Sequence, residues 1–168
     1  MACFPLDLEG CLDQHPSFLL IKMEMEVLNM RLWHYKLIPV LPRQQLLGQW
    51  RECCLIAKNI AEKGSPNHIL VNPVMDYDVE EFTGYCKLVV DEMTRRGYKS
   101  DIFDIFRKLN MCVPMSYSMH IADDHQFFPG WHNDQYLRQC LSNLQEKHDR
   151  GGITDNEWEA IIDSFSHI

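Results

Sequence analysis

The sequence lacks several patterns that would settle its structural class at once. No stretch reaches the 18 or so uninterrupted apolar residues of a membrane-spanning helix, so we expect no membrane association. No Cys-x-x-Cys pair is present, so zinc-ribbon chemistry has no support. There is no internal repeat and no convincing alternation of polar and apolar residues, so a β-rich fold is disfavoured.

An excess of positive charge is also lacking, since the formal net charge is −8. Affinity for DNA comes largely from Lys and Arg side chains that neutralise phosphates, so this balance argues against a nucleic-acid partner. Part of the acidity lies at the start: residues 1–29 hold five acids and one base, and residues 30–168 hold 19 acids and 15 bases. The bases nevertheless gather in two places, Arg31, Lys36, Arg43 and Arg51 ahead of the first acid after Met30, and later Arg95, Arg96 and Lys99.

Seven cysteines are present, an odd number that does not resemble the disulfide framework of a secreted protein. Cys53, Cys86 and Cys140 fall on apolar helical faces and are interpreted as small hydrophobic residues in a reducing cytosol. We therefore expect a cytoplasmic protein. A length of 168 residues predicts a single domain.

The clearest periodicity begins at Pro42 and runs to a natural stop at Gly64. Apolar residues recur at three and four positions, which predicts one buried helix face: Leu46, Trp50, Cys53 or Cys54, Ala57, and Ile60 or Ala61. Gln45, Gln49 and Glu52 align on a second, polar face.

Four further helices are predicted. One begins at Asp78, with Glu81 as the partner of a capping box, and ends at Gly97. A short helix over 100–109 should bury Ile102, Phe103 and Phe106, a long one should run over 133–148, and Thr154 with Glu157 should cap the last. The predicted fold is all-α, a compact single-domain bundle of about three long helices plus short helices.

The stretch M-R-L-x(6)-V-L-P-R-Q-Q-L-L-G-Q-W-R-E, which starts at Met30, resembles the start of the phage-type pyrimidine-dimer DNA glycosylases, also called endonuclease V. The matching positions of this chain are Gln44, Leu46, Trp50, Arg51 and Glu52. Weaker similarity continues from Ile69 to Gly97, so that about half of the chain is covered. The resemblance implies a helical, divergent relative of that family.

That resemblance also implies a chemistry. A glycosylase that cuts the DNA backbone needs an amine that attacks the sugar carbon and a carboxylate that assists proton transfers. Glu52 would be the carboxylate, and double-stranded DNA with damaged bases would be the substrate, with no cofactor. The residues expected to contact DNA are Arg31, Arg43, Gln44, Gln45 and Arg51. Trp33, His34 and Tyr35 are candidates for stacking on an extruded base, or else core residues.

The chain departs from the family pattern where the amine is concerned. The family uses an N-terminal Thr exposed by Met removal, whereas here Arg31 follows Met30, and Gln45 stands where the family has His. We hypothesise that translation starts at Met30, because Glu26-Val27 can be encoded by GAG-GTN, the core of a ribosome-binding site at a productive spacing. Residues 1–29 would then be an extension outside the native protein, and 30–168 the domain; a genuine N-terminal arm is the alternative.

With that start, the nucleophile would be the amine of Met30, and Lys36 is the fallback. Two rival interpretations remain open. One is a non-catalytic relative that binds nucleic acid or protein on the same scaffold. The other is a metal-dependent hydrolase that uses an imidazole- and carboxylate-rich stretch, although our main interpretation needs no metal. That stretch comprises His120, Asp123, Asp124, His125 and His132.

Overall fold

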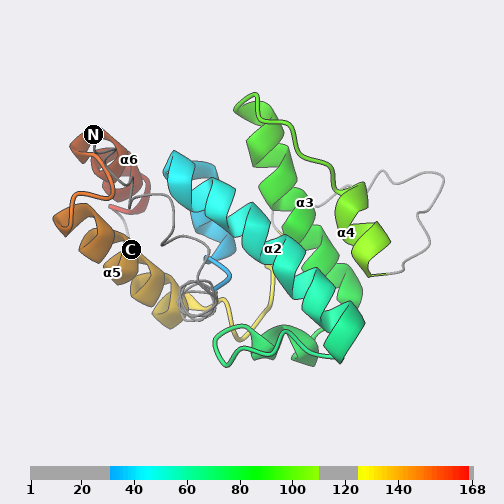
Figure 1. Ribbon diagram of the computed structural model, residues 1–168. Coiled ribbons are helices and arrows are strands. Elements are labelled where there is room, and N and C mark those ends of the chain that lie inside the picture. The colour runs from blue at the N-terminus through cyan, green and yellow to red at the C-terminus, as the bar shows by residue number, and fades with distance from the viewer. Residues whose placement is uncertain (1–30, 110–124, 167–168) are drawn as a thin grey trace, which may run out of the picture. The chain divides into compact units, whose positions relative to one another are not determined.

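The computed structural model describes residues 31–109 and 125–166, all of them within one compact unit, Arg31–Ile168. Every regular element of these residues is a helix, so the fold is all-α as predicted (Figure 1). In chain order the elements are η1 (Tyr35–Val40), α2 (Arg43–Lys63), η2 (Asn72–Asp76), α3 (Val79–Arg95), α4 (Phe103–Lys108), α5 (Asp134–Asp149) and α6 (Asp155–Phe165). None of the helices in the described residues is long and apolar enough to cross a membrane.

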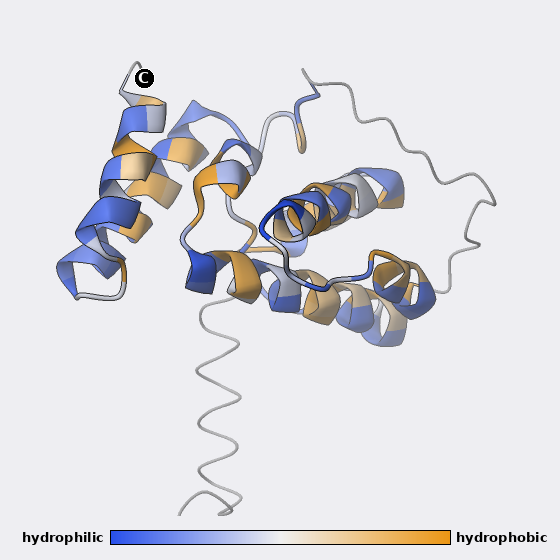
Figure 2. Cartoon of the chain, turned by 90° about the horizontal axis from the view of Figure 1, so that it is seen from above, coloured by the Kyte–Doolittle hydropathy of each residue, from blue (hydrophilic) through white to orange (hydrophobic). Residues whose placement is uncertain are grey.

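Helix α2 packs against both α3 and α4, and α5 packs against α6 (Figure 1). Each of these helices carries both polar and apolar residues, as the blue and orange bands in Figure 2 show, and the apolar residues form one buried stripe. The predicted stripe of α2 is confirmed at Leu46, Cys53 and Ala57, whereas Ala61 is exposed. Cys86 and Cys140 are free and buried, as expected of small hydrophobic residues.

Two of the capping predictions have different outcomes. Thr154 and Glu157 form the predicted capping box at the start of α6. The capping box predicted for α3 is wrong, because the Asp78 side chain makes no capping hydrogen bond. Glu81 instead accepts hydrogen bonds from the Phe128 backbone N–H at 2.6 Å and from His125 Nε2 at 3.2 Å. A carboxylate expected to serve its own helix is thus used to hold a distant loop.

The short helix α4 buries Ile105 and Phe106, but Phe103, which was predicted to point inward, is 42% exposed. The helix begins at Phe103, later than predicted, and Ile105 rather than Phe103 lies on its buried face. The remaining helix boundaries agree with the predicted ones to within a few residues.

Helix η1 was not predicted, and it contains Pro39. Its end is held by Arg96 at the end of α3, whose guanidinium donates to the carbonyls of Leu41 at 2.6 Å and Pro39 at 2.8 Å. Arg96 and Arg95 also pair with the buried Glu92. The second predicted cluster of bases is therefore largely neutralised and has a structural role.

The segment that precedes η1, Arg31–His34, which we call the lead-in, is extended and runs through the interior. Leu32, Trp33 and His34 are all buried. Gln49 of α2 accepts a hydrogen bond from the Trp33 backbone N–H at 2.8 Å, and its side chain is fully buried. The predicted polar face of α2 is therefore not a solvent face at its centre, because it binds the backbone of the lead-in.

Candidate active site around Glu52

Glu52 lies in the middle of α2 and is half-buried. Its Oε2 accepts a hydrogen bond from the backbone N–H of Arg31 at 3.4 Å, a long contact that joins α2 to the beginning of the lead-in. Burial raises the pKa of the Glu52 carboxyl to about 8, partly offset by the Arg31 N–H, the Arg31 charge and the Lys147 charge. A carboxyl with this pKa exchanges its proton near neutral pH, as a general acid or base must.

The register of the lead-in at this carboxyl is fixed by neighbours on three helices. Tyr136 of α5 donates its hydroxyl to the Leu32 carbonyl at 2.6 Å. Tyr85 of α3 donates to the Trp33 carbonyl at 2.7 Å, and Gln49 of α2 accepts from the Trp33 N–H. A slip by one residue would break all three hydrogen bonds. The nitrogen of Arg31 is therefore the backbone atom that this fold delivers to Glu52; Met30 lies outside the described residues.

The bases around Glu52 differ from those elsewhere in how they are paired. Among the described residues, the ion pairs of α3, α4 and the end of α5 neutralise most of the local Lys and Arg side chains. In the same residues no carboxylate lies within ion-pair distance of eight bases, which are Arg31, Lys36, Arg43, Arg51, Lys63, Lys99, Arg138 and Lys147. Two of these bases, Arg31 and Lys147, act on the Glu52 carboxyl, and Arg51 precedes it in the sequence. Two bases without a carboxylate partner in the described residues thus lie near this carboxyl in spite of the net charge of −8.

Three of the residues predicted to contact DNA line one pocket of about 380 Å³. Arg43, Gln44 and Gln45 form its side at the start of α2, and the turn between α5 and α6 forms the other side. Gln45 Oε1 is buried and has no hydrogen-bond partner among the described residues. The Arg43 guanidinium lies 5.9 Å from the centroid of the Tyr98 ring, a cation–π contact. Gln45 and Glu52 are seven residues apart, so they share a face of α2.

The acidic residue of this pocket is Glu157, which also caps α6. Hydrogen bonds from the Thr154 backbone and side chain hold its pKa below the ordinary value, with a contribution from the Arg43 backbone N–H. An ionised carboxylate at the start of α2 repels phosphate. The amide groups of Gln44 and Gln45 therefore suit a neutral, hydrogen-bonding group better than a phosphate.

Of the three candidate stacking residues, Trp33 and His34 belong to the interior. His34 is 1% exposed, its ring lies 5.2 Å from that of His132, and its Nε2 is 2.9 Å from the His132 carbonyl. The Tyr35 N–H donates to His132 Nδ1 at 3.3 Å. Burial lowers the pKa of His34 to about 4 and that of His132 to about 3, so both rings are neutral. The pair forms part of the scaffold that aligns the lead-in.

Two of the five residues proposed as metal ligands are described, and each has another role. His125 pairs with Glu81 at 3.2 Å, and His132 is buried against the lead-in. His120, Asp123 and Asp124 lie outside the described residues. In residues 31–109 and 125–166 no group of three or more His, Cys, Asp and Glu side chains is placed to hold a metal ion.

Sequence reasoning missed the contribution of α5 to this site. Tyr136 and Lys147 lie on the same face of α5 as the buried Cys140 and Leu144, and Arg31 lies near Cys140. The helical spacing of these four residues is visible in the sequence. Nothing in the sequence, however, links that face to Glu52, which is far away along the chain.

The comparisons with known proteins bear on the same region. Residues 30–106 match the model of a family described as pyrimidine dimer DNA glycosylase. No curated protein and no solved structure matches the chain. The matched residues contain the lead-in, α2 with Glu52, and α3, and stop before α5. Residues 30–106, a little under half of the chain, are therefore similar to the pyrimidine dimer DNA glycosylase family, as the opening motif predicted.

Proposed function

We propose that this protein is a DNA-repair glycosylase with AP-lyase activity, which acts on pyrimidine dimers or related base lesions through an amine-derived Schiff base. The observation that carries the proposal is the contact between Glu52 and the beginning of the lead-in, where Arg31 N lies 3.4 Å from the carboxyl oxygen. The family match over residues 30–106 supports DNA with pyrimidine dimers as the substrate class.

In the proposed reaction a neutral amine attacks C1′ of the damaged nucleotide, and the bond from C1′ to the base breaks. The departing base takes the electron pair of that bond and a proton. The attacking nitrogen gives up two protons, one to the departing base and one to O4′ as the sugar ring opens and the imine forms. Removal of a C2′ proton then forms the C2′–C3′ double bond, breaks the C3′–O bond and expels the 3′ phosphate, which cuts the strand. Glu52 moves protons between these groups, for which a carboxyl pKa of about 8 is well suited at neutral pH.

An α-amine is the appropriate nucleophile, because its reference pKa of about 7.7 to 8.0 leaves a neutral fraction near pH 7, whereas a Lys side chain near 10.4 leaves almost none. In a chain translated from Met30, this amine belongs to Met30 and directly precedes Arg31. In a chain that begins at Arg31, the amine would be the nitrogen 3.4 Å from Glu52. We assign the nucleophile to Met30 and use the second form as a test of the register.

The DNA strand would be held by the bases that have no carboxylate partner in the described residues. Arg31 acts on the Glu52 carboxyl and Arg51 precedes Glu52 on α2, so both are assigned to the phosphates beside the lesion. Arg43, Gln44 and Gln45, around the 380 Å³ pocket, are assigned to the nucleotide displaced from the stack.

The experiment is borohydride trapping on a duplex with a single abasic site. Four proteins are compared: the 168-residue chain, a chain that starts at Met30, a chain that starts at Arg31 after cleavage of a tag, and Glu52→Gln in the Met30 form. Glu62→Gln, an exposed acid on the same helix, is the matched control. Circular dichroism confirms that each protein is folded.

We expect a covalent adduct with the short chains and the Glu62→Gln control, its loss in Glu52→Gln, and none with the full chain. Mass spectrometry of the adduct should identify the α-amine. An adduct on a lysine, or equal trapping by the full chain, would contradict the assignment of the nucleophile.

A second candidate function is a non-catalytic relative that binds DNA on the same scaffold. It is favoured by Arg31 in place of the family's Thr and by Gln45 in place of its His. Binding to duplex DNA with no trapped adduct from any of the four proteins would support it.

A further inference from the structure

Four exposed aliphatic side chains gather between the end of α2 and the start of α3. Ile69 is 81% exposed, Leu70 and Met75 are each 47% exposed, and Val79 is 39% exposed. Single apolar residues on a surface need no explanation. Here, however, four of the six large apolar residues exposed in the described part of the chain fall within residues 69–79.

Hydrogen bonds tie together the backbone of the turn that carries Ile69 and Leu70. The N–H groups of Val71 and Asn72 both donate to the His68 carbonyl, at 3.0 and 2.9 Å. The Asn72 side chain accepts from the His68 N–H at 3.1 Å, and Val71 and Val74 are buried beneath the turn. The exposed aliphatic groups are therefore held in a preformed arrangement, which lowers the entropic cost of binding a partner.

The charge of the same segment has one sign. Residues 64–86 contain four acids and no Lys or Arg. Glu81 is engaged with His125 and Phe128, whereas Asp76, Asp78 and Glu80 are exposed and have no ion-pair partner among the described residues. We call the exposed apolar and acidic residues of this segment the 69–80 surface; they are Ile69, Leu70, Met75, Asp76, Asp78, Val79 and Glu80.

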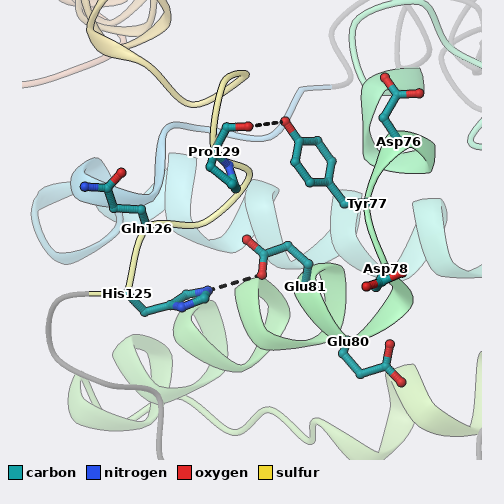
Figure 3. Close-up of a pocket in the computed structure, with 8 residues that line it drawn as sticks. All are labelled: Asp76, Tyr77, Asp78, Glu80, Glu81, His125, Gln126 and Pro129. Carbon is teal, nitrogen blue, oxygen red and sulfur yellow. Dashed lines mark hydrogen bonds and ion pairs between the residues drawn. The ribbon is translucent and has the colours of Figure 1, made fainter.

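A hollow of about 350 Å³ adjoins the acids of this surface. Figure 3 shows Asp76, Asp78 and Glu80 along one side of it and His125 and Gln126 along the other. A Lys or Arg side chain that entered this hollow would meet the carboxylates that line it, and Met75 and Val79 are the direct neighbours of these acids in the chain.

We propose that the 69–80 surface docks a segment of a partner protein in which Lys or Arg side chains stand next to aliphatic ones. The four acids and the lack of any base exclude DNA as the occupant, because phosphates would be repelled. A second copy of the chain fits poorly, since Phe103, another exposed apolar residue, lies beside bases that are already paired with Asp101 and Asp104. The surface is independent of the site at Glu52, so the proposal does not rest on the proposed function.

The test uses a fluorescein-labelled amphipathic peptide of leucine and lysine and the full 168-residue chain, with binding followed by fluorescence anisotropy. Two reference peptides replace lysine by glutamate or leucine by serine. One variant carries Ile69→Ser and Leu70→Ser, and another carries Asp76→Asn, Asp78→Asn and Glu80→Gln. Matched controls are Phe103→Ser with Ile162→Ser, and Glu62→Gln with Glu159→Gln and Asp163→Asn, all exposed residues on other elements.

We expect the leucine–lysine peptide to bind, each 69–80 variant to weaken binding at least about tenfold, and both controls to leave it unchanged. The glutamate peptide should not bind, and the serine peptide should bind at least about tenfold more weakly. Equal binding by the variants and the wild type, or an equal loss in the controls, would overturn the proposal.

Two further measurements separate the other occupants. If sedimentation shows a dimer that Ile69→Ser with Leu70→Ser converts to a monomer, the surface is a self-association face and the proposal is wrong. If the same variant weakens binding to duplex DNA, the surface contacts DNA and the proposal is again wrong. Unchanged melting temperatures show that a loss of binding does not reflect unfolding.

Discussion

Replacement of Gln49 by leucine offers a direct test of how the lead-in is held. Gln49 is fully buried, and its Oε1 accepts the Trp33 backbone N–H at 2.8 Å, while its Nε2 lies 3.7 Å from the sulfur of Cys53. Leucine has a similar volume but offers no acceptor, so the Trp33 N–H would remain buried and unpaired. Such a group costs about 1 to 3 kcal/mol, so we expect Gln49→Leu to lower the free energy of unfolding by about 2 kcal/mol.

Urea denaturation measures this change, and the midpoint of thermal unfolding should fall by about 4 to 8 °C for a chain of this size. Gln44→Leu is the matched control: it makes the same replacement at an exposed position of α2, where the effect should stay within about 0.5 kcal/mol. Equal stability of the two variants would refute the role given to Gln49. Gln49→Leu should also reduce adduct formation under conditions where it remains folded, because Arg31 would no longer be held at Glu52.

The remaining predictions concern ionisation and one structural arginine. Between pH 7 and pH 5, His34 and His132 should each lower the free energy of unfolding by roughly 2 kcal/mol. Their pKa values are about 4 and about 3 in the folded protein but 6.5 in the unfolded chain, so over this range the unfolded chain takes up protons and the folded protein does not. Glu52 acts oppositely over this window: its folded pKa of about 8 exceeds the unfolded 4.5, so it stabilises the fold by roughly 2 kcal/mol as pH falls. Glu52→Gln should therefore steepen the acid loss of stability by that amount in urea titrations, and an unchanged slope would contradict the burial of Glu52. Lys147→Met should raise the pKa of Glu52 and move the pH profile of adduct formation to higher pH, whereas Lys147→Arg should not. Arg96→Lys should lower the free energy of unfolding, measured in urea, by about 2 kcal/mol. The lysine ammonium cannot reproduce the pair of hydrogen bonds that the guanidinium donates to the carbonyls of Leu41 and Pro39.

The helices could be predicted from the sequence because their signals are local. The stop at Gly64, which takes a left-handed φ of 74°, and the Thr154–Glu157 capping box each depend on residues within one or two turns. Amphipathic periodicity then correctly placed Leu46, Cys53 and Ala57 on the buried face of α2, Cys86 on that of α3 and Cys140 on that of α5. Information of this kind is contained in a short window of the chain.

What could not be predicted depends on partners far away in the sequence. Glu81 has the spacing of a capping residue, and its use by Phe128 is decided by a loop 47 residues later. From the sequence, Gln49 belongs to a polar face of α2, and only its hydrogen bond with the backbone of Trp33 shows that it is buried. Among the site residues, Glu52 was identified through the family resemblance. Tyr136 and Lys147 could be identified only from the structure, in which α5 lies beside the lead-in.

The lead-in also determines when the site can form during synthesis. Its partners come late, because Leu32 bonds to Tyr136 across 104 residues and His34 contacts His132 across 98. At about 5 to 20 residues per second, the ribosome needs roughly 5 to 20 s to make the intervening chain. Until then α2 and α3 can pair, but the backbone of Leu32 lacks its partner. A nascent or truncated chain that ends before α5 therefore contains Glu52 but lacks Tyr136, which holds the lead-in, and Lys147, which acts on the carboxyl.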